Sequence, residues 1–85
     1  MRINSYPKEF AESIHIEIEA ENDTHCIICL TNQRGSVKMM MGVNVSEGPN
    51  NITVNQVEKL EAGLYSLKIK NIDAVLLYNS VVIKQ

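Results

Sequence analysis

Two cysteines, Cys26 and Cys29, are the residues whose type and spacing could support redox or metal chemistry in this chain. They lie in the run HCIICLT, which is rich in apolar and β-branched residues and is typical of a strand. Strand residues three apart point to opposite faces, with Cα atoms about 10 Å apart, whereas a disulfide needs less than about 7 Å. No second Cys or His pair completes a zinc set. We therefore expect two free, buried or half-buried thiols.

Histidine and acidic side chains are the other candidates for a metal site. His15 and His25 fall in or beside neighbouring strands, and the acidic residues alternate between Glu17 and Asp23. Calcium prefers about six to eight oxygens from a shaped loop, and this stretch lacks the glycine and the spacing of such loops. It is therefore predicted to be a solvated strand face followed by a turn. The chain also contains no nucleophile motif and no Gly-rich phosphate loop, so we expect no enzyme activity, no cofactor and no metal.

Size and charge restrict the possible partners. The chain has 85 residues, which predicts one domain over residues 1–85, and a net charge of -2 from 8 basic and 10 acidic residues. No block of Lys and Arg indicates a nucleic-acid or anionic-membrane surface. No apolar run reaches the ~18–20 residues needed to cross a bilayer, and the first ten residues lack the apolar core of a signal peptide. The chain is then either cytoplasmic or the C-terminal part of a longer secreted precursor.

Alternating hydrophobicity predicts an all-β domain. Ile14, Ile16 and Ile18 alternate with polar residues, which is typical of a half-buried strand. Similar segments recur at a spacing of roughly ten residues, which favours an immunoglobulin-like antiparallel β-sandwich of about six or seven strands. The expected strands cover 13–20, 25–31, 36–43, 51–57, 64–70 and 75–85, with the last one continuous or broken near Asn79. The expected connections are turns at 21–24, 32–35, 46–51 and 71–74, and a short connection at 58–63 that is either irregular or one helical turn.

Particular residues are predicted to shape the turns and the core. Gly35 is expected to supply a positive φ in a hairpin loop, and Gly63 to do so at a corner between the sheets. Tyr65 then enters the core, and its hydroxyl is expected to bond upstream backbone, as in a tyrosine corner. In the final strand, Val81 and Ile83 have two interpretations: they face the core, or they serve recognition by another chain.

Five short motifs resemble those of one known family. In chain order they are YPKEF (6–10), LTNQRGSVK (30–38), GPNNITV (48–54), LEAGLYSLKI (60–69) and SVVIKQ (80–85). Together they resemble the type A C-terminal sorting domain of the type IX secretion system of Bacteroidetes. Pro7 matches the first proline of the family's opening motif, whereas Glu9 stands where the family has a second proline. The Gly63–Tyr65 motif is the most specific match.

The resemblance implies that the chain is a targeting signal for the protein that carries it. Such a domain ends a secreted cargo protein, passes through the periplasm, and directs the cargo through the outer membrane to the cell surface or medium. The implied partners are translocon, shuttle and sortase components, with no small-molecule substrate. The implied recognition residues are Gly63 and Tyr65 together with the terminal strand residues Val81, Val82, Ile83 and Lys84.

A second reading of the sequence remains open. The chain could be an accessory or spacer β-sandwich module, either carbohydrate-binding or a stand-alone periplasmic domain, with no sorting role. Sugar binding is disfavoured because the only aromatic residues are three Tyr and one Phe, with no Trp to stack on a sugar. In either case, exposed edge strands would allow a homodimer.

Overall fold

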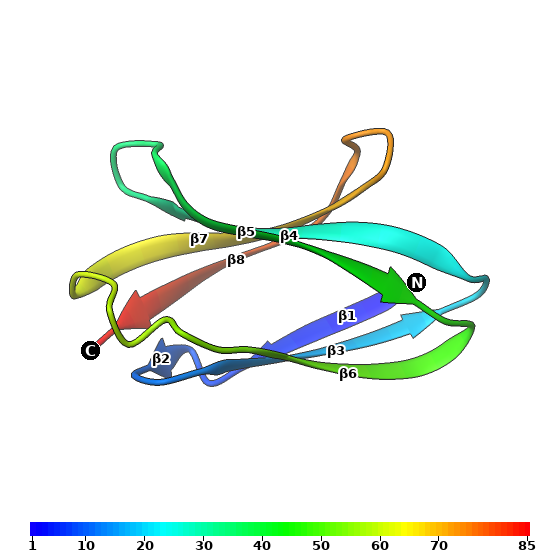
Figure 1. Cartoon of the computed structure of the whole chain (residues 1–85), viewed down its shortest axis with the longest axis horizontal. Coiled ribbons are helices and arrows are strands. Elements are labelled where there is room, and N and C mark those ends of the chain that lie inside the picture. The colour runs from blue at the N-terminus through cyan, green and yellow to red at the C-terminus, as the bar shows by residue number, and fades with distance from the viewer.

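The computed structural model describes residues 1–85 and has two stacked β-sheets (Figure 1). One sheet has the strand order β1-β3-β6 and the other β2-β8-β7-β4-β5. All pairs are antiparallel except the parallel pair of β2 with β8. The predicted immunoglobulin-like β-sandwich is therefore confirmed. The strands are β1 (Arg2–Tyr6), β2 (Glu9–Phe10), β3 (Ile14–Ala20), β4 (Thr24–Asn32), β5 (Val37–Val45), β6 (Gly48–Val54), β7 (Gly63–Asn71) and β8 (Leu76–Lys84).

The core lies between the sheets and follows the alternation seen in the sequence. The isoleucines of β3 are fully buried, and so are the inward residues of the two central strands of the larger sheet, β4 and β7. A hydrogen bond of 2.7 Å between the hydroxyls of Ser5 and Tyr78 also joins β1 to β8 across the layers. The largest fully buried side chains are Phe10, Ile14, Ile16, Ile18, Ile28, Leu30, Leu67, Ile69, Val45, Val54, Val57 and Val82.

Three predicted boundaries were wrong. The segment before Ile14 forms β1 and β2, so the sandwich has eight strands, including one of only two residues. The turn expected at 46–51 is shorter in the structure, where only Ser46 and Glu47 connect β5 to β6. Pro49 lies within β6, an edge strand, so the N–H that proline lacks is not needed for pairing on the open side. The connection before β7 contains a single turn at Glu58 and Lys59, closed by the N–H of Leu60 donating to the carbonyl of Val57, rather than a helical turn, and Gly63 already belongs to β7.

The core-facing interpretation of Val81 and Ile83 was wrong. Val82 is 1% exposed and Lys84 is 8% exposed, whereas Val81 and Ile83 are exposed, so the core positions are 82 and 84. Three apolar residues in a row give no alternation, and a lysine would ordinarily be assigned to solvent. The structure instead buries the stem of Lys84 at the end of the sandwich, where its amine donates to the carbonyl of Gln85 at 2.8 Å.

The larger sheet is built from two equivalent hairpins, β4–β5 and β7–β8. Their loops rise at opposite ends of the upper layer in Figure 1. Each hairpin has a register shift next to its loop: Leu30 faces Met39 and Thr31 faces Val37, just as Ile69 faces Tyr78 and Lys70 faces Leu76. Every position of the second hairpin thus lies 39 residues after its equivalent in the first.

Candidate recognition site at one end of the sandwich

The first and last motifs of the chain meet in one sheet. β2 lies parallel to the end of β8, with Glu9 opposite Ile83 and Phe10 opposite Lys84. Two backbone hydrogen bonds hold them: the N–H of Ile83 donates to the carbonyl of Lys8 at 2.7 Å, and the N–H of Gln85 donates to that of Phe10 at 2.9 Å. The motif that contains Pro7, which follows a cis peptide bond, therefore stands beside the terminal strand.

The motif at 60–69 joins them from the other side of β8. Gly63 pairs with Lys84, and Tyr65 pairs with Val82. The rings of Tyr65 and Phe10 contact edge-on with centroids 6.4 Å apart. Three motifs that are far apart in the sequence thus converge at the end of the molecule that carries the C-terminus (Figure 1).

Glycine is required at this corner by its backbone conformation. Gly63 has a φ of 142°, which L side chains rarely adopt, and a Cβ there would meet no atom within 4 Å. Tyr65 is buried, and its hydroxyl donates to the carbonyl of Glu61 at 2.7 Å. The predicted tyrosine corner is confirmed. Gly35 also has the predicted positive φ, 85°, in the β4–β5 loop.

Most of the outer edge of β8 is uncovered. The N–H of Ile83 points toward β2, and backbone directions alternate along a strand, so the backbone groups of Val81 and Asn79 point to the same side. β2 pairs only with Ile83 and Lys84 and leaves these groups without a strand partner. The side chains of Val81 and Ile83 are 54% and 39% exposed on the outer face of the sheet. The strand therefore offers both backbone groups and apolar side chains to another chain.

An open depression of about 550 Å³ lies next to the corner. Its walls come from the β4–β5 loop, from β5 and from the segment that leads into β7, including Gly63 and Tyr65. Arg34, Lys38 and Lys59 line it together with a single acidic residue, Glu61.

The cysteines are placed as the spacing predicted. Both are free and buried, with Cys26 in the core between the sheets and Cys29 turned to the outer face. Burial raises the pKa of the Cys26 thiol, which favours the protonated, unreactive form.

Each histidine hydrogen-bonds a neighbour on its own sheet. The Nδ1 of His25 lies 3.0 Å from the Oδ1 of Asn44, and the Nδ1 of His15 lies 3.3 Å from the Oγ1 of Thr53. No group of three or more His, Cys, Asp or Glu side chains is arranged to hold a metal ion. Separately, the structure has no helix that is long and apolar enough to cross a membrane.

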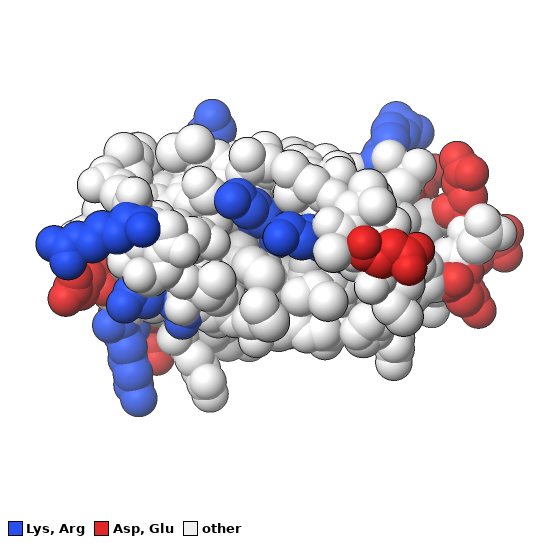
Figure 2. Space-filling model, turned by 90° about the horizontal axis from the view of Figure 1, so that it is seen from above, with Lys and Arg blue, Asp and Glu red and all other residues white.

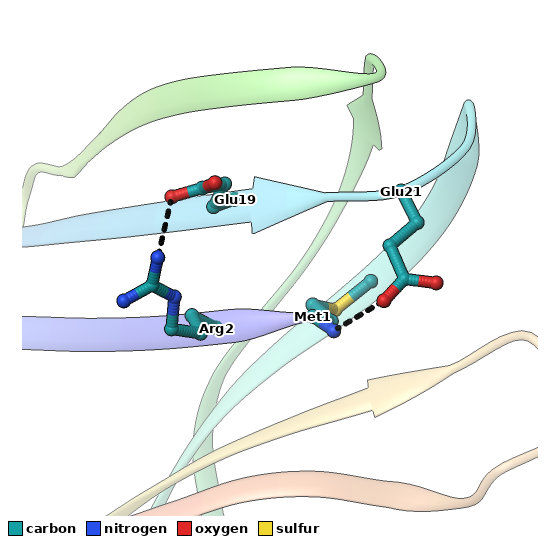
Figure 3. Close-up of polar contacts among 4 residues, drawn as sticks. All are labelled: Met1, Arg2, Glu19 and Glu21. Atoms are coloured by element: carbon teal, nitrogen blue, oxygen red, sulfur yellow. Dashed lines mark ion pairs between the residues drawn. The ribbon is translucent and has the colours of Figure 1, made fainter.

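The acidic stretch forms the solvated face expected, and it partly pairs with β1. Glu19 and Glu21 make the two ion pairs of the chain, with Arg2 and with the amino group of Met1, each at 3.7 Å (Figure 3). All of these groups except the amino group of Met1 are largely exposed, so the pairs add little stability.

Sequence reasoning missed two features of this end of the molecule. The contact of β2 with β8 gave no signal, because two residues are too few for a periodicity. The basic lining of the depression was missed because Arg34, Lys38 and Lys59 are scattered in the sequence and form no run. Only Arg34 and Lys38, which flank the hairpin glycine, could have been recognised as neighbours.

Comparison with known protein families gives no match, and neither does comparison with curated proteins. Among solved structures, the fold is similar to part of a β-glucosidase from Listeria innocua in complex with isofagomine, with 14% identity and a TM-score of 0.60 over 98% of this chain. A mutant of that enzyme with laminaribiose gives 15% identity and a TM-score of 0.56 over 99% of this chain. The chain spans only 16% of the length of these proteins. The likeness shows the β-sandwich fold alone.

Proposed function

We propose that this β-sandwich is a C-terminal sorting domain that directs a secreted cargo protein through the outer membrane by the type IX secretion system. One observation supports this proposal above the others: three of the five motifs that carry the resemblance meet at one end of the fold, through residues 6–10, 63–65 and 81–84. A single receptor surface could therefore contact all three. The proposal includes no enzyme activity.

The proposed route follows from the resemblance. The domain would pass through the periplasm with its cargo and meet shuttle and translocon components there, and a sortase at the cell surface. Recognition would use the exposed face and open edge of β8, with the Gly63–Tyr65 corner holding β8 in place. Val82 and the stem of Lys84 would support the strand from the core side rather than contact a receptor.

The test is export of a reporter with residues 1–85 fused to its C-terminus and a signal peptide at its N-terminus, in a bacterium that has a type IX system. Val81→Glu with Ile83→Glu changes two exposed apolar residues of β8. The matched control, Val37→Glu with Met40→Glu, makes the same change at exposed apolar residues of β5. We expect export with the unchanged domain and the β5 variant, and retention of the β8 variant in the periplasm.

Truncation of the last five residues would be a poorer test, because it removes the buried Val82 and would unfold the domain. Thermal unfolding of the purified variants checks that each substituted domain is folded. If the unchanged domain fails to export the reporter, the sorting proposal is wrong. If the folded β8 variant is exported normally, β8 is not the recognition element.

The second candidate is an accessory β-sandwich module of a larger protein. The observation in its favour is that the similar solved sandwiches are parts of much longer β-glucosidase chains. In that case the unchanged domain would stay with its reporter in the periplasm, and its removal from the native protein would leave the location of that protein unchanged.

A further inference from the structure

Cationic side chains from two separate segments line the depression beside the corner. Arg34 and Lys38 come from the β4–β5 hairpin, and Lys59 comes from the connection between β6 and β7. All three are exposed, and Glu61 is the only acidic residue of the lining. The chain as a whole is acidic, with a net charge of -2, so this local excess of positive charge opposes the average of the molecule.

The fold does not need these charges. The ion pairs of the chain involve Glu19 and Glu21, so none of the three cations is paired with a carboxylate. The equivalent hairpin gives an internal control, because it has the same loop hydrogen bonds but carries Asp73 and Leu77 at the positions of Arg34 and Lys38.

Cationic and acidic side chains are distributed unevenly over the face of the larger sheet. In Figure 2, which looks onto the larger sheet, blue side chains lie at the left-hand end, in the middle and at the upper right, and most red side chains lie at the right-hand end, with a smaller red group at the left. Most of the face between the two ends is uncharged. An acidic partner would therefore meet less like charge at the left-hand end than at the right-hand end, where most of the carboxylates lie.

The shape of the depression favours an extended chain over a small anion. Its lining is exposed or half-buried except for Tyr65, whose hydroxyl is already bonded to Glu61, so no buried donor is free to hold a single ion. Lys38 lies at the start of β5, the terminal strand of the sheet. The N–H of Asn32 points toward β5, so by alternation along β4 the backbone groups of Leu30 and Ile28 do so too. Their partners beyond the register shift are Met39 and Met41, so the backbone groups of Met40, Gly42 and Asn44 face away from β4.

We propose that this depression binds the carboxylates of an acidic peptide segment of another protein, which continues as an added strand along the free edge of β5. Cations around the depression would attract the acidic side chains, and the edge of β5 would supply backbone hydrogen bonds. The site is separate from the β8 surface and does not rest on the sorting function.

The test uses the purified chain and a fluorescein-labelled peptide of five Ser-Glu repeats, with five Ser-Gln repeats as the uncharged probe. Binding is measured by fluorescence anisotropy at low salt, and its location by amide chemical shifts. Lys38→Glu with Lys59→Glu reverses two charges of the lining. Lys68→Glu with Lys70→Glu is the matched control, because it changes the net charge equally at residues of β7 outside the lining.

We expect the first double variant to weaken binding of the acidic peptide about tenfold or more, and the control to weaken it less than about threefold. Amide shifts should appear in the β4–β5 loop and along β5. Equal weakening by both variants would mean attraction by overall charge only, and would overturn the proposal. The proposal would also be overturned by amide chemical-shift changes confined to β8. Saturable binding of inorganic phosphate at the amides of the β4–β5 loop and β5, without binding of the peptide, would overturn it as well.

If Lys38→Glu with Lys59→Glu does not fold, Arg34→Gln in the exposed loop takes its place, with Lys68→Gln as its control. A folded Arg34→Gln variant should weaken binding about threefold, and unchanged affinity would then overturn the proposal. Because no secretion machinery is present in this assay, its failure is independent of the outcome of the export experiment.

Discussion

The two hairpins of the larger sheet have the same backbone plan but different residues. β4–β5 and β7–β8 share the strand lengths, the register shift and the loop hydrogen bonds, yet only Asn32/Asn71 and Val43/Val82 are identical among the equivalent pairs. Their burial also follows the same alternation along each strand. The plan therefore depends on alternation and loop chemistry rather than on particular side chains.

The loops show how this is achieved. In each, the asparagine side-chain oxygen accepts from the N–H groups two and four residues later, and the residue three positions on has positive φ. This is a three-residue hairpin loop, a turn followed by a left-handed residue. The difference lies in the exposed positions: the first loop carries Gln33 and Arg34, and the second carries Ile72 and Asp73. The shared residues build the loop, and the variable ones are free to serve binding.

The largest expected effect tests whether the two hairpins contribute equally to the core. Ile28 and Leu67 are equivalent, and neither is exposed to solvent. We expect Ile28→Ala and Leu67→Ala each to lower the free energy of unfolding by about 2–5 kcal/mol, because each leaves a cavity between the sheets. Urea denaturation measures both. A loss under about 1 kcal/mol for one of them would show that the hairpins are not equivalent in the core.

The loop asparagines should come next. We expect Asn32→Ala and Asn71→Ala each to cost about 1–2 kcal/mol, because each change leaves two backbone N–H groups without their acceptor. The loops are partly solvated, so water replaces some of the loss. The midpoint of chemical denaturation gives the comparison, with Gln33→Ala in the same loop as a control that touches no hydrogen bond of the loop. Unequal costs would mean that the two loops differ in strain.

The left-handed position should give opposite signs in the two loops. Gly35 has a φ of 85° and Ala74 a φ of 64°. We expect Gly35→Ala to lower the stability by about 1 kcal/mol and Ala74→Gly to raise it by up to about 1 kcal/mol, because only glycine adopts this region without steric cost. The melting temperatures of the two variants and of the unchanged protein, measured in the same buffer, test both signs. Destabilisation by Ala74→Gly would indicate that the side chain of Ala74 makes a contact worth more than its backbone strain.

The last expected effect, similar in size to that of Gly35→Ala, concerns the position where the hairpins differ most inside the core. Cys26 and Tyr65 are equivalent inward residues, but only Tyr65 carries a hydroxyl bonded to upstream backbone. We expect Tyr65→Phe to lower the stability by about 1 kcal/mol, the net value of one hydrogen bond. The measurement is the midpoint of chemical denaturation of the Tyr65→Phe variant, compared with that of the unchanged protein. An unchanged midpoint would show that the bond to Glu61 does not stabilise the corner.

Much of the fold could be predicted where the alternation is clean. The burial of Ile14, Ile16 and Ile18, the inward face of β7 and the positive φ of Gly35 all followed from period two and from turn chemistry. The same reasoning could not assign the inner and outer faces of the last strand, because Val81, Val82 and Ile83 are all apolar and show no alternation. Its pairing with β7 decides its faces, since Val82 must share the inner side with Tyr65.

The sequence by itself determined the β class, the hairpin loop at Gly35 and the free state of the cysteines, because each depends on residues that are close along the chain. Only the tertiary structure decided which strands are edges and which segments meet. The pairing of β2 with β8 and the gathering of Arg34, Lys38 and Lys59 are contacts between distant segments, and backbone hydrogen bonds and charges carry no pattern that identifies a distant partner in advance. The candidate recognition surfaces depend on those contacts, so they became visible only in the folded chain.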